Sequence, residues 1–199
     1  MELPQDGRRR AFIEHVRPQV DCGRAALKRV LGETIEVRAD VIAEGHERIA
    51  YVGFSPARPD MERTRGLTDC LQAHKLEFSR FEIRAPVIAE GERICAAVVL
   101  RKDRPDAVVC YNDMVAIGFL GAARSLGISV PADLSVVGID NIPFGRFTSP
   151  PLTTVDTQSE FLGEEGMRLL FRRIGGDAAA TGHITVEPRL VVRESTRQR

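Results

Sequence analysis

Two pairs of polar residues follow short apolar runs in this sequence, and they are its best candidates for binding chemistry. The pairs are Asn112-Asp113 and Asp140-Asn141. Amides and carboxylates that follow buried strands lie at the sheet edge where open α/β proteins bind ligands. Each pair also has a structural reading, because Asn and Asp cap helices and start turns. Their joint placement after consecutive strands favours binding, so we expect Asn112 and Asp140 to contact a ligand at one edge of a sheet.

A single arginine completes this candidate site. Arg63 lies in the segment MERTRGL, just after a proline-containing loop and at the start of an expected helix. A lone arginine in that position is most often solvated surface. At the same sheet edge as Asn112 and Asp140, its planar guanidinium would bind hydroxyls or a carboxylate. Arg63 and Asp140 would then bind opposite sides of a polyhydroxylated or zwitterionic small molecule.

The sequence contains little that indicates catalysis or a metal. Its four histidines lie far apart, beside charged residues or at the boundaries of expected elements. The motifs H-E-x-x-H and G-x-S-x-G and the glycine-rich phosphate loops do not occur. The four cysteines form no C-x-x-C pair, and we expect reduced, mostly buried thiols. We therefore expect no enzyme, no metal site and no cofactor.

The composition and charge of the chain are typical of a globular protein. The 199 residues include 28 basic and 28 acidic side chains, so the chain offers no overall basic field for nucleic acid. Any DNA contact would have to be local. The first thirty residues lack the uninterrupted apolar segment of a secretory signal, and no run of about 18 apolar residues occurs. We expect a cytoplasmic location and no contact with a membrane.

Strand and helix patterns alternate from Gly45 onward, which predicts a parallel α/β sheet because parallel strands need crossover connections. Strands are expected at 48–54, 77–83, 107–111, 134–139, 152–155, 184–186 and 189–192, and helices at 61–74, 89–100, 114–126 and 159–174. Before Gly45, residues 21–31 have helical spacing, whereas 35–43 fit either a strand or a helix.

Several motifs of the sequence together resemble those of a known family. They are GHERIAYVGF followed by R-x-x-G-L, then N-D-M-x-A-x-G, V-P-x-D-L-S-V-V-G-x-D and P-P-L-T-T-V, and finally EPRLVVRESTRQR. In these phrases the chain resembles the effector-binding core of the lactose-repressor (LacI/GalR) family of transcription regulators. The resemblance runs from Gly45 to Arg197.

The resemblance implies a sensor of the periplasmic-binding-protein type, with two Rossmann-like lobes that close on a sugar or a purine, and it implies a homodimer. By position, Arg63, Asn112 and Asp140 match the family's effector-contacting arginine, asparagine and aspartate. Val87 matches, to within a residue or so, a position where an aromatic ring often stacks on the ligand. An aliphatic residue there argues against a stacking type of sugar site.

The resemblance also predicts how the chain is divided. Family members carry a helix-turn-helix headpiece, a hinge helix and a full N-terminal lobe before the strand that here begins at Arg48, and no headpiece is evident. We therefore expect a nearly complete C-terminal lobe and an incomplete N-terminal lobe. Residues 1–45 form an unclear segment that is a candidate N-lobe remnant, residues 46–199 form the sensor domain, and residues 157–182 cross to the partial N-lobe.

Three functions compete at this point. The first is the small-molecule sensor of a LacI-type regulator, which controls operator DNA binding through a headpiece not evident in this chain. The second is a solute-binding module of the transport type, against which the lack of a signal segment counts. The third is a decayed regulator fragment without a ligand. If only one lobe is present, the inner face of the helix at 159–174 should be exposed.

Overall fold

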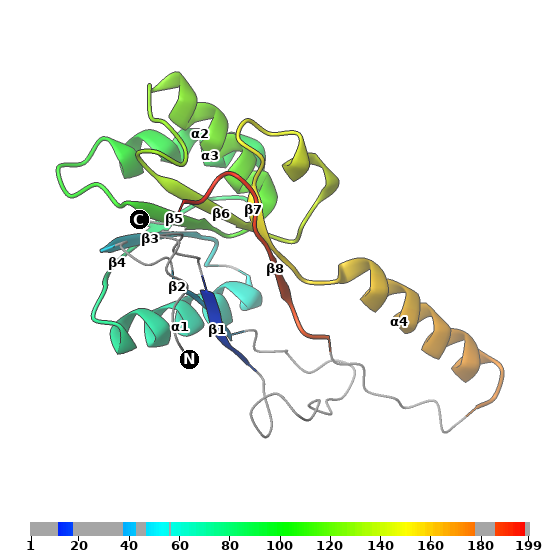
Figure 1. Ribbon diagram of the computed structural model, residues 1–199. Helices are drawn as coiled ribbons and strands as arrows, with labels where there is room; N and C mark the ends of the chain where they lie inside the picture. Colours follow the sequence, from blue (N-terminus) through cyan, green and yellow to red (C-terminus); the bar gives the residue numbers. More distant parts are fainter. Residues whose placement is uncertain (1–11, 18–37, 43–46, 56, 178–185, 198–199) are drawn as a thin grey trace, which may run out of the picture.

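One mostly parallel sheet of six strands dominates the protein in its computed structural model, which describes residues 12–17, 38–42, 47–55, 57–177 and 186–197 (Figure 1). The strand order is β4-β3-β5-β6-β7-β8, and only β8 runs antiparallel to its neighbour. The strands are β3 (Arg48–Gly53), β4 (Glu77–Glu82), β5 (Ala107–Cys110), β6 (Ser135–Ile139), β7 (Thr153–Asp156) and β8 (Arg189–Val191).

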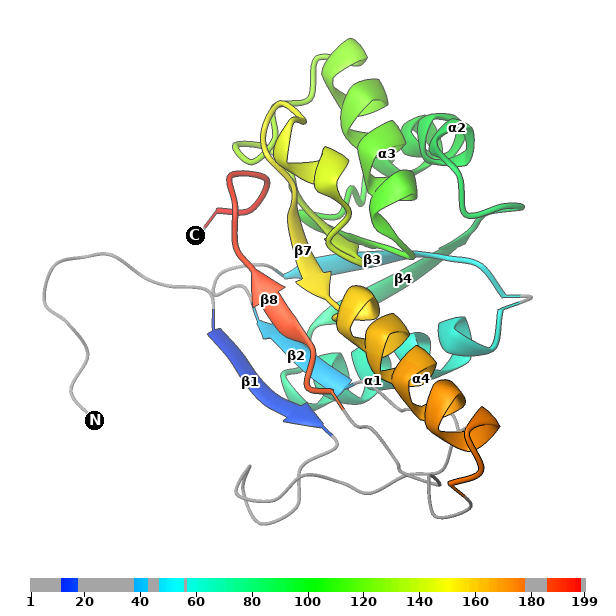
Figure 2. The same ribbon diagram turned by 90° about the vertical axis from the view of Figure 1, so that its right-hand side faces the viewer.

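Helices cover both faces of this sheet (Figures 1 and 2). One face carries α2 (Ile88–Val99) and α3 (Asp113–Ser125), and the other carries α1 (Arg58–Ala73). A short 3-10 helix, η1 (Pro143–Arg146), follows β6, and α4 (Ser159–Ile174) follows β7. The expected α/β fold with a parallel sheet is therefore confirmed.

The side chains of β3 show how the two faces are filled. Ala50 and Val52 pack into the large cluster under α2 and α3, whereas Ile49 and Tyr51 point to the side of α1. Alternate residues of a strand point to opposite faces, so a strand covered on both sides reads as one continuous apolar run. This explains why the central strands could be located from the sequence.

The expected elements agree closely with the observed ones. The expected helix at 159–174 coincides with α4, and the other helices begin within three residues of their predicted starts. The ambiguous segment 35–43 contains the strand β2 (Arg38–Ile42), which pairs with β1 (Phe12–Arg17) in a separate antiparallel sheet. The helix predicted at 21–31 and most of the strand predicted at 184–186 lie outside the described residues.

Helix α4 leads away from the six-stranded sheet in both views (Figures 1 and 2), and none of its residues is buried. Several of its apolar side chains are open to solvent, with Leu170 48% and Ile174 72% exposed, whereas Leu162 and Leu169 are half-buried. The exposed inner face expected for this helix is thus found only in part. Among the described residues, no helix is both long and apolar enough to cross a membrane.

Two glycines allow α2 and α3 to approach each other closely. A Cβ atom at Gly118 would lie 2.0 Å from the carbonyl oxygen of Ile88, and one at Gly91 would lie 2.0 Å from that of Val115. Both obstacles are backbone atoms, which cannot swing aside as a side chain can. The contact between the helices therefore depends on the absence of a side chain at these two positions.

We expect Gly118→Ala to lower the free energy of unfolding by about 1–3 kcal/mol, because the new methyl group forces α2 and α3 apart. Gly121→Ala is the matched control in the same helix, since a Cβ there meets nothing within 4 Å. It should stabilise the protein by up to about 1 kcal/mol through helix propensity. Urea denaturation measures both values, and equal effects at the two positions would contradict the close-contact explanation.

Candidate functional site

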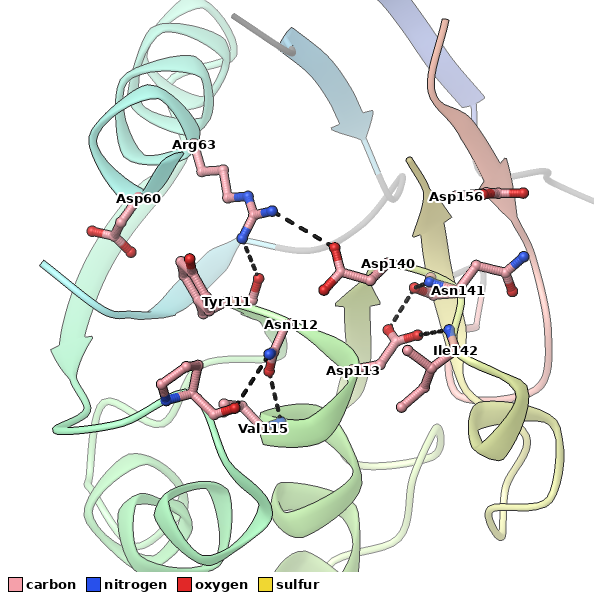
Figure 3. A network of polar contacts seen from close by, with 12 residues as sticks. Asp60, Arg63, Tyr111, Asn112, Asp113, Val115, Asp140, Asn141, Ile142 and Asp156 are labelled. Atoms are coloured by element: carbon pink, nitrogen blue, oxygen red, sulfur yellow. Dashed lines mark hydrogen bonds and ion pairs between the residues drawn. The ribbon is translucent and has the colours of Figure 1, made fainter. Parts of the chain in front are cut away.

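The carboxyl ends of β3, β5 and β6 meet at one edge of the sheet, and the candidate residues gather there (Figure 3). Asn112 comes two residues after the end of β5, and Asp140 comes directly after β6. Arg63 reaches the same edge from α1. The structure therefore brings together three of the residues that the sequence singled out.

Arg63 is held in place by its neighbours. Its Nη1 donates a hydrogen bond of 2.6 Å to the carbonyl oxygen of Tyr111, and its guanidinium carbon lies 4.6 Å from the centre of the Tyr111 ring. Its Nη2 lies 3.8 Å from Oδ1 of Asp140, which is a charge pair at long range rather than a hydrogen bond. The two side chains therefore attract each other without a direct hydrogen bond between these atoms.

Asp140 and Asn141 adopt an unusual backbone. Their φ angles are 108° and 52°, in the left-handed region that side chains other than glycine seldom enter. The elbow that they form is fixed from below by Asp113, whose Oδ2 accepts a hydrogen bond of 2.8 Å from the Ile142 amide. From the C-terminal segment, Arg193 donates a hydrogen bond of 2.7 Å to Oδ1 of Asn141.

Asp113 itself is fully buried. Its Oδ1 accepts a hydrogen bond of 2.5 Å from the Thr154 hydroxyl, which in turn accepts one from the Asn141 amide. Burial raises the pKa of Asp113 to about 6, against the lowering effect of the hydrogen bonds from Thr154 and Ile142. A Cβ at Gly138 would lie 2.1 Å from Oδ1 of Asp113, so only glycine fits beside this carboxylate.

Burial likewise raises the pKa of Asp140, and the charge of Arg63 opposes that shift. The Asp140 side chain is 37% exposed and that of Arg63 is 20% exposed. Both groups are thus partly withdrawn from water yet open on one side. Charge pairs in such surroundings act more strongly on a bound molecule than pairs on an open surface.

Asn112 fulfils the structural role that competed with binding. Its Oδ1 accepts a hydrogen bond of 3.0 Å from the Val115 amide and so caps α3, while its Nδ2 donates one of 3.3 Å to the carbonyl oxygen of Pro86. Pro86 directly precedes Val87, which is the N-cap of α2 and is 44% exposed. Asn112 therefore joins the starts of the two helices at the site.

Sequence reasoning missed a buried network that supports Arg63. Asp60, buried in the first turn of α1, accepts hydrogen bonds from the Tyr51 hydroxyl (2.9 Å), the Phe54 amide (2.6 Å) and Nη2 of Arg80 (2.5 Å). This network fixes the loop between β3 and α1, one turn before Arg63. The only local signal was an acidic residue after a proline, which also occurs at the start of many exposed helices.

Within the described part of the chain, no group of three His, Cys, Asp or Glu side chains is placed to hold a metal ion. Cys70, Cys95 and Cys110 are buried thiols, and burial raises the pKa of the Cys95 thiol to about 12. A thiol of that pKa is not a nucleophile at neutral pH. The groups at the sheet edge are hydrogen-bond donors and acceptors suited to binding a polar molecule.

A search against family models matches residues 39–196 to the periplasmic binding protein-like domain. The HTH-type transcriptional repressor PurR of Mannheimia succiniciproducens is 34% identical over 162 residues, which are 79% of this chain and 48% of that protein. The HTH-type transcriptional regulator MalR of Streptomyces coelicolor is 49% identical over 90 residues, which are 45% of this chain and 26% of that protein.

Solved structures agree with these matches. The Lac repressor dimer bound to operator and the anti-inducer ONPF has a TM-score of 0.68 at 26% identity, covering 76% of this chain and 53% of that chain. The complex of the transcriptional regulator CelR with cellobiose has a TM-score of 0.66 at 30% identity, covering 76% and 47%.

The chain therefore belongs to the periplasmic binding protein-like domain family, in the form found in LacI-type transcriptional regulators. It spans about half the length of the PurR relative. A second, shorter match joins residues 9–64 to domain N/S of alpha-1,4-glucan:maltose-1-phosphate maltosyltransferase. That match includes β1 and β2 and ends within α1.

The buried carboxyl group of Asp113 should make stability depend on pH. Its folded pKa of about 6 lies above the value of about 3.9 in an unfolded chain, so the folded state binds more protons between these values. The contribution of Asp113 to stability is therefore greatest below about pH 4 and is lost as the pH rises through about 6. Relative to Asp113→Asn, the native chain should lose about 2 kcal/mol over that range.

Urea denaturation at several pH values between 4 and 7 measures this difference. Asp103 provides the control, because Arg101 holds the pKa of that exposed carboxyl below its usual range. The difference between the native chain and Asp103→Asn should therefore change with pH in the opposite direction. A constant difference for Asp113→Asn would show that Asp113 keeps an ordinary pKa.

Proposed function

We propose that this chain is the small-molecule-sensing part of a LacI-type transcriptional regulator and that its sheet edge forms one wall of an effector cleft. The observation that carries the proposal is the Arg63–Asp140 pair, a fixed cation and a fixed anion whose Nη2 and Oδ1 atoms lie 3.8 Å apart. Effector-binding residues are then Arg63, Asn112, Asp140 and Val87. This site binds its ligand and carries out no reaction.

A sugar-like effector fits these groups better than a nucleobase-like one. Hydroxyl groups both donate and accept, so one polyol can accept hydrogen bonds from Arg63 and donate to Asp140. The cellobiose complex of CelR supports a sugar, because that relative is similar over 76% of this chain. Val87 offers an aliphatic contact rather than an aromatic ring, so recognition relies on hydrogen bonds more than on stacking.

The response to the effector is a shift between two arrangements of the regulator. A molecule that contacts both this wall and the opposite lobe binds the closed form of the regulator more tightly than the open form. It therefore shifts the population towards the closed form. The Lac repressor structure, a dimer on operator DNA, supports a homodimer that binds an operator through a helix-turn-helix headpiece. A regulator of this kind acts in the cytoplasm, where the operator is.

The domain division follows from the same proposal. Residues 46–199 form the sensor domain, and residues 157–182 cross towards a partial N-terminal lobe, in keeping with the way α4 leaves the sheet (Figure 2). Residues 1–45 form the candidate remnant of the N-terminal lobe. Its described strands, β1 and β2, pair only with each other.

We expect Asp140→Asn to weaken effector binding by about 1.5–3 kcal/mol, or roughly 10- to 100-fold in Kd, because an amide accepts the ligand's hydroxyl more weakly than a carboxylate. Calorimetry of the full chain with maltose, cellobiose, hypoxanthine and guanine identifies the effector class first and then measures the loss.

Asp103→Asn is the matched control for Asp140→Asn. Asp103 also has an arginine partner, Arg101, but the two are directly hydrogen-bonded and lie on an exposed surface. This control should leave the affinity unchanged. If a ligand binds the native chain and Asp140→Asn equally well, Asp140 does not belong to the binding site. If hypoxanthine binds and neither maltose nor cellobiose does, the effector is nucleobase-like rather than sugar-like.

A further inference from the structure

Arg193 joins the C-terminal segment to the left-handed elbow of Asp140 and Asn141. Its Nη2 donates a hydrogen bond of 2.7 Å to Oδ1 of Asn141, and its Nη1 donates one of 2.5 Å to the carbonyl oxygen of Leu152. The two acceptors belong to different parts of the chain, because Asn141 follows β6 and Leu152 precedes β7. The planar fork of one guanidinium therefore holds the elbow against the start of β7.

The main chain that carries Arg193 is fixed independently of its side chain. The Arg193 amide donates a hydrogen bond of 2.9 Å to Oγ1 of Thr153. Two residues later, the buried hydroxyl of Ser195 accepts a hydrogen bond of 2.7 Å from the Thr153 amide and donates one of 2.6 Å to the carbonyl oxygen of Val136. These bonds attach the segment to β6 and β7, and none of them uses the guanidinium. A change of the Arg193 side chain therefore acts on the elbow and leaves the segment attached.

The elbow needs such a support because its backbone is strained. Asp140 and Asn141 both have φ angles in the left-handed region. The Asn141 amide makes only a long hydrogen bond of 3.3 Å to the Thr154 hydroxyl. Its side-chain bond to Arg193 is shorter and involves a charged donor, so it is the stronger contact of Asn141.

The charge of Arg193 acts on the buried carboxyl group beneath the elbow. Burial raises the pKa of Asp113, and the nearby charge of Asp140 raises it further, whereas the charge of Arg193 lowers it. Arg63 is the cation that opposes the effect of burial on Asp140. The two arginines thus act on different carboxyl groups of the same site.

We propose that Arg193 is a positioning residue of the effector site and that it holds the carboxylate of Asp140 in place through Asn141. The inference rests on the proposed function, in which Asp140 is an effector contact, but the elbow itself can be studied without a ligand. The end of the sensor domain thereby supports the site, 52 residues after Asn141 in the sequence.

Hydrogen exchange of the full chain without ligand measures the stability of the elbow. The amides of Asn141 and Ile142 both donate hydrogen bonds at the elbow, and they should exchange about tenfold faster in Arg193→Gln, because the elbow then opens locally. The Ile83 amide, which donates a hydrogen bond of 2.9 Å from the end of β4 to β3, is the internal reference and should keep its native rate. An equal acceleration of all three amides would show that Arg193 only stabilises the fold, which would overturn the proposal.

Arg193→Lys separates the charge of this residue from its fork. Lysine keeps the positive charge but has one nitrogen atom in place of the two that reach different acceptors. NMR titration of the side-chain carboxyl carbons should show a raised pKa of Asp113 in Arg193→Gln and the native pKa in Arg193→Lys. The fast exchange of the elbow amides should persist in both variants. Arg189→Gln is the matched control, because it removes the same charge from an exposed position on β8, and it should change neither measurement.

The effect on binding is measured by calorimetry with the sugar or nucleobase that binds the native chain. Arg193→Gln should raise its Kd about tenfold, and Arg189→Gln should leave it unchanged. Because Arg193 acts through Asp140, the same change should have a much smaller effect when it is made in Asp140→Asn. Equal effects of Arg193→Gln in the two backgrounds would show that Arg193 does not act through Asp140.

The measurements with and without ligand separate this inference from the effector proposal. If maltose, cellobiose, hypoxanthine and guanine all fail to bind, the proposed effector classes are wrong, while the exchange rates still decide whether Arg193 holds the elbow. If the elbow amides keep their native rates in Arg193→Gln, Arg193 does not position Asp140, whichever molecule binds.

Discussion

The buried carboxylate of Asp113 holds the candidate site together. It belongs to the first turn of α3, yet its two oxygens bind the Ile142 amide after β6 and the Thr154 hydroxyl on β7. Three elements are thereby tied at one point beneath the left-handed elbow of Asp140 and Asn141. The hydrogen bonds to Asp113 stabilise this elbow, in which two residues have strained backbone angles. The direction in which Asp140 points therefore depends on a residue that need not touch a ligand.

A second support of the same kind lies on the other side of the site. Asp60 lies in the first turn of α1, and its carboxylate accepts hydrogen bonds from Tyr51 and Phe54 at the end of β3 and from Arg80 of β4. These bonds fix the start of α1, one turn before Arg63. The two charged groups that face each other at the site are thus each backed by a buried carboxylate. Such supporting contacts are what hold binding groups in one geometry.

The strands of the sheet and the residues at its edge could be predicted from the sequence, because they depend on local patterns. Apolar runs located β3, β5 and β6, and the parallel pairing of β5 with β6 then places Asn112 and Asp140 at one edge. The roles of Asp113 and Asp60 could not be predicted, because their partners lie on other elements, as Thr154 does 41 residues away. The sequence likewise left open which residue caps α3, and only the structure shows that Asn112 does so while Asp113 turns inward.

The side chain of Arg63 is held in place before any ligand binds, and this affects the energetics of binding. A free arginine side chain carries about 2 kcal/mol of rotamer entropy, and a molecule that captures it must overcome that loss. Here the Tyr111 carbonyl and ring already restrict the guanidinium, so the ordering has taken place during folding. Any molecule that meets Arg63 encounters a rigid surface, and differences between molecules should appear in how long they stay rather than in how fast they arrive.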